Sequence, residues 1–166
     1  MPSSYTAPGL EESDASQVRD SLQYRLIALI DLQLTLKHIH WNVVGPSFIG
    51  VHEMLDPQHA AVSRMVDATA ERIATLGGQP LGTPGAVVEG RTWEDYGINR
   101  ALTPEHLAAL DHVYVGVIED HRKAIELSGD IDPVTEDLLI GQTNQLELFH
   151  WFVRAHLEDK SGQLNS

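Results

Sequence analysis

Residues 40–78 read HWNVVGPSFIGVHEMLDPQHAAVSRMVDATAERIATLGG, and this stretch decides the fold. Gly45-Pro46 ends the helical pattern that leads into it, because proline cannot continue a helix. Ser47 can cap the next helix, in which apolar residues recur every three or four positions from Val51 to Ile73. Gly77-Gly78 then supplies a common C-terminal stop. The stretch therefore predicts two long helices joined by a tight turn.

Further helical patterns lie on both sides of this stretch. Apolar residues from Val18 to Val43 step by three or four and predict the first helix. Thr103-Pro104 and Asp132-Pro133 each start another helix, with the threonine or aspartate as cap and the proline in the first turn. Ser128-Gly129-Asp130 separates these two helices, so the C-terminal half forms a second helical hairpin.

The segment 77–102 joins the two hairpins and is rich in glycine and proline. A connection this long is usually a crossover or a functional element, and we expect a short extra helix near Trp93 to Tyr96. Four-helix bundles with one long crossover are the ferritin-like variety. We predict an all-α ferritin-like bundle over residues 15–158, between a flexible N-terminal tail, 1–14, and a short C-terminal tail, 159–166.

Composition excludes several classes of protein. The net charge of -13 argues against a basic surface for nucleic acid. A surplus of carboxylates suits a protein that collects cations, although acidic surfaces also simply keep proteins soluble. The chain has no cysteine, which removes disulfides, thiolate zinc sites and iron–sulfur clusters. No stretch is apolar enough for a membrane helix and no signal peptide is visible, so we expect a cytoplasmic protein.

The second helix carries metal-ligand side chains along one side. His52 and Asp56 are four residues apart, and so are Asp67 and Glu71. Residues four apart lie one above the other on a helix, so each pair can hold one ion. At about 100° per residue, all four side chains fall within an arc of roughly 100°. An amphipathic surface helix can also show this pattern by accident.

The distance between the two pairs prevents one chain from closing a site. Asp56 and Asp67 lie about 16 Å apart along the helix axis, whereas metal–ligand bonds are about 2 Å long. If two copies of the helix lie antiparallel about a two-fold axis near Ala61, the His52 end of one faces the Glu71 end of the other. Isologous two-fold interfaces are the commonest in homo-oligomers. The spacing therefore predicts two equivalent sites shared by two subunits.

His40 can complete each site from the first helix. It lies six residues before Pro46 and His52 lies six after, so an antiparallel hairpin brings the two histidines to similar height. Two imidazoles with carboxylates suit ferrous iron, and also zinc or manganese. Trp41 follows directly, and its indole can either pack or donate electrons to the oxidised site.

These residues resemble the Dps mini-ferritins, the DNA-protection-during-starvation proteins. The resemblance rests on the combination HWN, H, D, D and AER within residues 40–72. It extends to residues 82–93 and 134–140, and so covers most of the chain. No single one of these motifs would be specific, whereas the combination is.

The resemblance implies a dodecameric cage that oxidises Fe(II), preferably with hydrogen peroxide, and stores ferric mineral as a protection against oxidative stress. It implies two iron ions per inter-subunit site. The ligands that it implies are His40, His52 and Asp56 from one subunit, and Asp67 and Glu71 from its two-fold mate.

An acidic pore for iron entry is also implied by the resemblance. The family has such a pore at a three-fold axis, near the start of the fourth helix. Asp137 is the best match to a pore aspartate, and Asp130 and Asp132 are weaker candidates. Asp132 has an alternative role as a helix cap.

A DNA-compacting structural protein with incidental metal binding is one alternative. Many family members bind DNA through lysine-rich tails, but residues 1–17 contain no Lys or Arg and the segment after Glu158 has only Lys160. A dodecamer would also multiply the negative charge, which repels phosphate. We therefore expect no strong direct DNA binding and place nucleoid association behind a plain cytoplasmic location.

A di-iron site inside one bundle is a second alternative. That design needs two Glu-x-x-His pairs and two further glutamates. Glu147 and His150 form one such pair, whereas Glu119 is followed by Arg122 at the same spacing. The internal site is incomplete, so we expect His150 to be structural or on the surface. The third alternative is a helical oligomer whose metal ligands do nothing catalytic.

Overall fold

The computed structural model describes residues 5–158, and these form the four long helices and the crossover that the sequence predicts. In chain order the elements are α1 (Glu12–Asn42), β1 (Val43–Val44), α2 (Phe48–Thr75), α3 (Pro84–Gly90), β2 (Ala101–Leu102), α4 (Thr103–Gly129) and α5 (Pro133–Leu157). Residues 1–4 and the predicted tail 159–166 lie outside the described residues. Within the described range, no helix combines the length and apolar character needed to cross a membrane.

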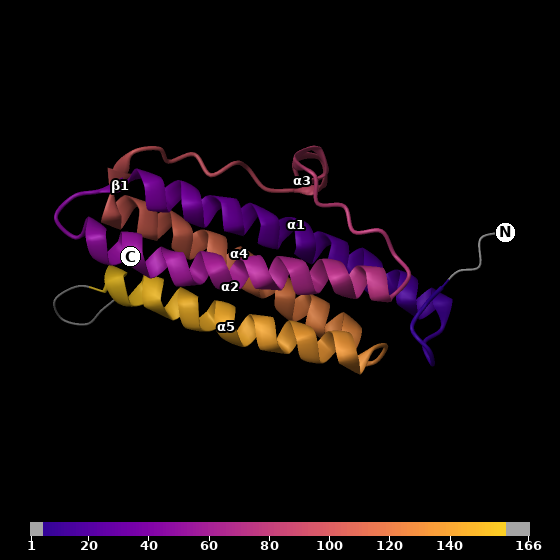
Figure 1. Ribbon diagram of the computed structural model, residues 1–166. Coiled ribbons are helices and arrows are strands. Elements are labelled where there is room, and N and C mark those ends of the chain that lie inside the picture. The colour runs from indigo at the N-terminus through magenta and orange to yellow at the C-terminus, as the bar shows by residue number, and fades with distance from the viewer. Residues whose placement is uncertain (1–4, 159–166) are drawn as a thin grey trace.

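The four long helices lie side by side as a bundle (Figure 1). α1 and α2 form one antiparallel hairpin, and α4 and α5 form the other. The turn of the first hairpin depends on Gly45, whose φ of +107° is a left-handed backbone conformation that favours glycine. The crossover runs back along the bundle, so the end of α1 lies beside the start of α4.

Two groups of buried apolar side chains fill the bundle. The larger group takes residues from all four long helices, among them Leu36, Leu55, Leu110 and Phe149. The smaller group includes Val18, Leu22, Ile73 and Leu139. The predicted apolar stripes are confirmed, because one side of each long helix is buried and the ligand positions on α2 lie outside that side.

The crossover differs from the prediction in the position of its short helix. The extra helix occupies Pro84–Gly90, so the expectation of a helix near Trp93 to Tyr96 is wrong. Thr83 caps this helix by accepting a hydrogen bond from the Ala86 N–H, and Pro84 stands in the first turn. A two-residue parallel bridge between β1 and β2 closes the crossover, and it is too short to leave an alternating pattern in the sequence.

The N-terminal segment packs on the bundle before α1 begins. α1 starts at Glu12, within the range 1–14 that was expected to be a tail. Ala7 and Leu10 pack against the smaller core group, and the Thr6 hydroxyl donates to the backbone oxygen of Leu10 at 3.1 Å. The expectation of a flexible tail is therefore wrong for the part of this segment that packs on the bundle or belongs to α1.

α2 ends just before Gly77-Gly78, as the sequence predicts. Gly77 has a φ of +81°, and the Gly78 N–H donates to the backbone oxygen of Ile73 at 2.9 Å. This pattern closes a helix through a left-handed residue just after its last turn. A side chain at position 77 would also collide with the backbone of Tyr5, so glycine is required there for space as well.

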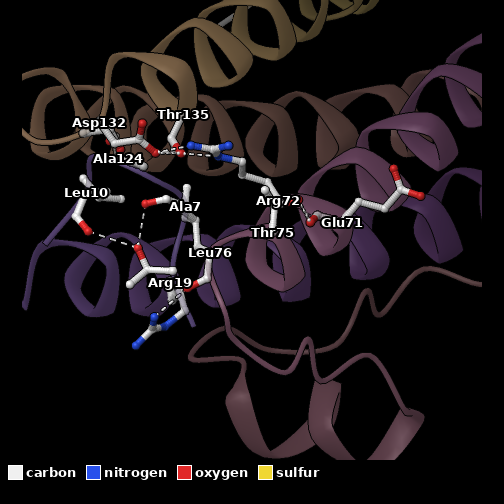
Figure 2. A network of polar contacts seen from close by, with 12 residues as sticks. Ala7, Leu10, Arg19, Glu71, Arg72, Thr75, Leu76, Ala124, Asp132 and Thr135 are labelled. Atoms are coloured by element: carbon white, nitrogen blue, oxygen red, sulfur yellow. Dashed lines mark hydrogen bonds and ion pairs between the residues drawn. The ribbon is translucent and has the colours of Figure 1, made fainter. Parts of the chain in front are cut away.

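An ion pair between the partly buried Arg72 and the buried Asp132 links α2 to the turn between α4 and α5 (Figure 2). Arg72 donates from Nη2 to the Asp132 carboxylate at 2.6 Å and from Nε to the Thr135 hydroxyl at 2.9 Å. Asp132 occupies the N-cap position of α5, but its side chain makes no capping hydrogen bond and binds Arg72 and Thr135 instead. The N-cap residue of α4 is Leu102 and Thr103 is its first helical residue, so the prediction of Thr103 as the N-cap is wrong.

This ion pair makes stability depend on pH. Burial opposes ionisation of Asp132, but the hydrogen bond from Thr135 and the Arg72 guanidinium outweigh it, so the pKa of this carboxyl lies below its usual value. The pair therefore contributes fully above about pH 4, the unfolded-state pKa. The contribution is lost as the pH falls through the lowered pKa of the folded state.

We expect Asp132→Ala to lower the free energy of unfolding by roughly 1–3 kcal/mol at pH 7, because the partly buried Arg72 then loses its carboxylate partner. Urea unfolding measures the change, and the difference from wild type should shrink as the pH falls below about 4. Asp137→Ala, at an exposed position of the same helix, should change stability by less than about 0.5 kcal/mol. Equal effects of the two substitutions would contradict the assignment.

Candidate metal centre

His40 on α1 and His52 on α2 stack on each other near the turn of the first hairpin. Their ring centroids are 3.6 Å apart and their planes are inclined by 22°. His40 Nδ1 lies 2.9 Å from the backbone oxygen of His52, and His52 Nδ1 lies 2.8 Å from the backbone oxygen of His40. The expected meeting of these two histidines across the hairpin is confirmed.

The reciprocal hydrogen bonds determine the chemistry of both rings. A carbonyl oxygen only accepts, so the Nδ1 atom of each ring must carry the proton. In a neutral imidazole the Nε2 atom then has the free lone pair. Metal-binding histidines are commonly oriented in this way, by a hydrogen bond from the other ring nitrogen. His40 and His52 are therefore both prepared to ligate a cation through Nε2.

Asp56 lies beside these histidines but is already paired with a cation. One of its carboxylate oxygens, Oδ1, is 3.4 Å from His40 Nδ1 and accepts a hydrogen bond from Lys37 Nζ at 2.6 Å. The hydrogen bond from Lys37 and the nearby positive charge lower the pKa of Asp56, so the group is ionised at neutral pH. Sequence reasoning missed Lys37, although its position three residues before His40 on the same helix was a usable signal.

Asp67 and Glu71 form a separate, unpaired set on the same helix. Both are exposed, and within residues 5–158 their carboxylates make no hydrogen bond or ion pair. Arg72 follows Glu71 directly, but Figure 2 shows its side chain directed to the other side of the helix. Because Asp132 and Thr135 hold Arg72 there, this cation does not neutralise the Glu71 carboxylate.

One chain does not bring the two sets together. α2 continues without a break from Phe48 to Thr75, through Pro57, so Asp56 and Asp67 stay about 16 Å apart. Among the described residues, no group of three or more His, Cys, Asp or Glu side chains could hold a metal ion. The structure thus brings His40, His52 and Asp56 together and leaves the other two predicted ligands at a distance.

The remaining predicted site residues lie in three different settings. Trp41 is 72% exposed, so it does not pack into the interior of its own chain. Asp130 and Asp137 are exposed around the start of α5. Asp132 is 5% exposed, and its ion pair with Arg72, rather than pore lining, accounts for its place in the fold.

The ligands of the rival internal site are engaged elsewhere. Glu147 accepts a hydrogen bond from Arg122 Nε at 3.0 Å, and His150 Nε2 lies 2.7 Å from the Asp111 carboxylate. His150 is therefore a structural residue, as expected. His121 is buried against Gln142, and burial lowers the pKa of this histidine to about 4, so it is neutral at physiological pH.

Comparison with known proteins defines the class of this chain. The Ferritin family, described as a ferritin-like domain, matches residues 19–161. The two hairpins and their crossover are therefore a ferritin-like domain, in agreement with the architecture predicted from the sequence.

More specific relatives narrow this class. The chain is 60% identical over 161 residues to the DNA protection during starvation protein of Mycolicibacterium smegmatis, with 97% of this chain and 88% of the relative covered. A solved structure of Mycobacterium smegmatis Dps matches with a TM-score of 0.96 and 59% identity, covering 98% of this chain and 100% of that one. DpsA14 from Streptomyces coelicolor matches with a TM-score of 0.95 and 59% identity, covering 98% and 96%. The chain belongs to the Dps family, and the resemblance seen in the sequence is confirmed.

Lys37→Met should strengthen the binding of Co(II), used as an unreactive divalent probe, because a metal ion at Asp56 must otherwise displace the lysine. We expect an increase in affinity on the order of two- to fivefold in a calorimetric titration of the full chain. Lys123→Met removes another lysine that binds an aspartate outside the proposed ligand set, Asp120, and serves as the control, with no change expected. Unchanged or weaker binding in Lys37→Met would show that the pair does not compete with metal.

Proposed function

We propose that this protein is a ferroxidase and iron-storage mini-ferritin. It oxidises Fe(II), preferably with hydrogen peroxide, at sites shared by two subunits, and stores the ferric product as mineral. The observation that carries the proposal is the stacked pair His40 and His52, whose Nδ1 atoms are both committed to backbone oxygens, with the Asp56 carboxylate 3.4 Å from Nδ1 of His40. The name of the mycobacterial relative, DNA protection during starvation, fits the removal of iron and peroxide, which together damage DNA.

Each proposed site takes two iron ions as substrate. Asp56 and the partner subunit's Glu71 hold the tighter iron, with His40 and His52 beside it, and the partner subunit's Asp67 completes the ligand set. Carboxylate and imidazole ligands hold the two irons close and favour the ferric product. Two Fe(II) ions each lose one electron, the O–O bond of hydrogen peroxide breaks, and two protons are taken up to form two water molecules. Dioxygen is the alternative oxidant.

The half-sites support a two-fold arrangement of subunits. The half-site of His40, His52 and Asp56 has only one carboxylate from its own chain, and the half-site of Asp67 and Glu71 lacks any partner among the described residues. An antiparallel copy of α2 supplies what each lacks. The proposed assembly of such pairs is a dodecameric cage, and large exposed apolar side chains such as Leu34 and Trp41 provide surface for its contacts.

Iron entry and electron supply are assigned to residues outside the ligand set. Asp137 is the proposed pore residue, with Asp130 beside it at the same end of the bundle, and Asp132 is the weakest candidate because it is buried. Trp41, exposed next to His40, either packs against a neighbouring subunit or donates electrons to the iron site. The proposed location of this activity is the cytoplasm.

Co-expression of two inactive variants tests the shared site directly. His52→Ala/Asp56→Ala removes one half of the ligand set, and Asp67→Ala/Glu71→Ala removes the other. We expect each variant alone to lose rapid formation of ferric absorbance after Fe(II) and peroxide are mixed. Random co-assembly restores one complete site in each mixed pair, so about a quarter of the wild-type sites should return.

Two controls make this result interpretable. Glu126→Gln, an exposed carboxylate on α4, should leave the oxidation rate unchanged. Light scattering should give each assembly roughly the mass of twelve 18.3 kDa chains, about 220 kDa. If all variants assemble and co-expression restores no activity, the shared site is wrong.

A gel-shift measurement distinguishes the proposed function from the DNA-compacting alternative. Because the chain carries a net charge of -13 and residues 1–17 lack Lys and Arg, we expect no shift of linear DNA in a gel at physiological salt without divalent cations. Added magnesium can bridge the two acidic partners and serves as the positive control. Tight complexes formed in its absence would favour the DNA-binding function.

A further inference from the structure

A cavity of about 510 Å³ lies between α1 and α4, under the crossover segment 92–97. None of the five proposed iron ligands lines it. Its walls are mostly apolar or aromatic, and they include Leu32, Val113, Val117, Trp93 and Tyr96. Small-molecule sites are commonly cavities of about 300–1,000 Å³ with apolar walls and a few polar groups. The cavity has the size and lining of such a site.

Arg25 supplies a buried hydrogen-bond donor at the wall of the cavity. It is 6% exposed and lines the cavity. Its Nη2 reaches one oxygen of Asp120 only at 3.4 Å, while Lys123 binds the other oxygen at 2.8 Å. Its Nη1 is buried and has no hydrogen-bond partner in the described part of the chain. A buried donor without an acceptor is unfavourable, so the Arg25 guanidinium at this wall has an unmet need for an acceptor.

The charges around the cavity determine which acceptor fits. Asp31 is bound by Arg91 at 3.3 Å and by the Trp93 indole N–H at 2.8 Å, and Asp95 is paired with Arg91. Counting the lining groups and their ion-pair partners, four carboxylates face three cations: Asp31, Glu94, Asp95 and Asp120 against Arg25, Arg91 and Lys123. A further anion is therefore disfavoured, and a cation cannot accept a hydrogen bond from Arg25. The group that best fits beside Arg25 is therefore an uncharged hydrogen-bond acceptor.

Gly116 keeps one wall of the cavity open. It lies in the middle of α4, where glycine is a poorer helix former than alanine. A Cβ atom there would meet nothing within 4 Å, so packing within the chain does not require glycine. The open space faces the cavity, which Gly116 lines.

We propose that this cavity binds a small neutral molecule with a ring-sized apolar body and a carbonyl or similar acceptor oxygen. The oxygen accepts a hydrogen bond from Nη1 of Arg25, and the body packs between the crossover aromatics Trp93 and Tyr96 and the apolar residues of α1 and α4. This inference does not depend on the proposed ferroxidase activity.

Three probes of one shape and different charge test the ligand class: benzamide, benzoate and benzamidine. Their binding to the assembled full-chain protein is measured by calorimetry or ligand-detected NMR. We expect benzamide to bind about tenfold more tightly than benzoate, because only benzamide offers an acceptor without a charge. Protonated benzamidine, which has no acceptor, should not bind detectably. Absence of benzamide binding, or tighter binding of benzoate, overturns the proposal.

Two substitutions locate the binding. Arg25→Met removes the donor and should weaken benzamide binding by about 10- to 100-fold. Gly116→Leu fills the cavity from a position where helix propensity improves, and it should abolish binding of every probe. Gly141→Leu is the matched control, because a Cβ there also meets nothing within 4 Å and the residue does not line the cavity. If Arg25→Met fails to fold, Gly116→Leu alone decides, and unchanged benzamide affinity in that variant overturns the proposal.

Discussion

The rise of about 1.5 Å per residue along α2 is the constraint on which the proposed chemistry depends. The buried side of this helix, which includes Leu55, Val62 and Ile73, packs into the core along most of its length. The helix therefore cannot bend to bring Asp56 and Asp67 together. Any site that uses both carboxylates must use two chains, so the proposed metal site depends on association between subunits.

The two halves of the proposed site are prepared in opposite ways. Near the hairpin turn, His40 and His52 hold each other through backbone carbonyls, and Lys37 already occupies Asp56. Near the other end of α2, Glu71 has no cation beside it, because Arg72 is held by Asp132 and Thr135. In the proposed pairing of two subunits, the half-site in which Lys37 binds Asp56 would face the half-site in which Asp67 and Glu71 are unpaired. Iron bound as proposed would compete with Lys37 at the first half-site and would meet no such cation at the second.

The crossover keeps its position through a few side-chain contacts with the bundle. Trp93 donates to Asp31 on α1, His38 meets the backbone oxygen of Ile98, and the Tyr96 hydroxyl lies 2.8 Å from Nδ1 of His106 on α4. These contacts hold the loop above α1 and α4 without filling the space between them. The cavity that contains Arg25 is a consequence of this arrangement, since small residues such as Ala28 and Gly116 line it.

Local rules were enough to predict the four long helices, the Gly45 and Gly77 turns and the shared face of the two pairs of candidate ligands on α2. Helix periodicity and the backbone preferences of glycine and proline act within a few residues, and positions four apart must share a face. The same rules misplaced the short helix, because both parts of the crossover carry similar turn residues. Only the tertiary structure decided that Lys37 meets Asp56, that Arg72 turns toward Asp132, and that Arg25 is left without an acceptor. Those contacts join residues far apart in the chain, and their existence depends on how the helices pack against one another.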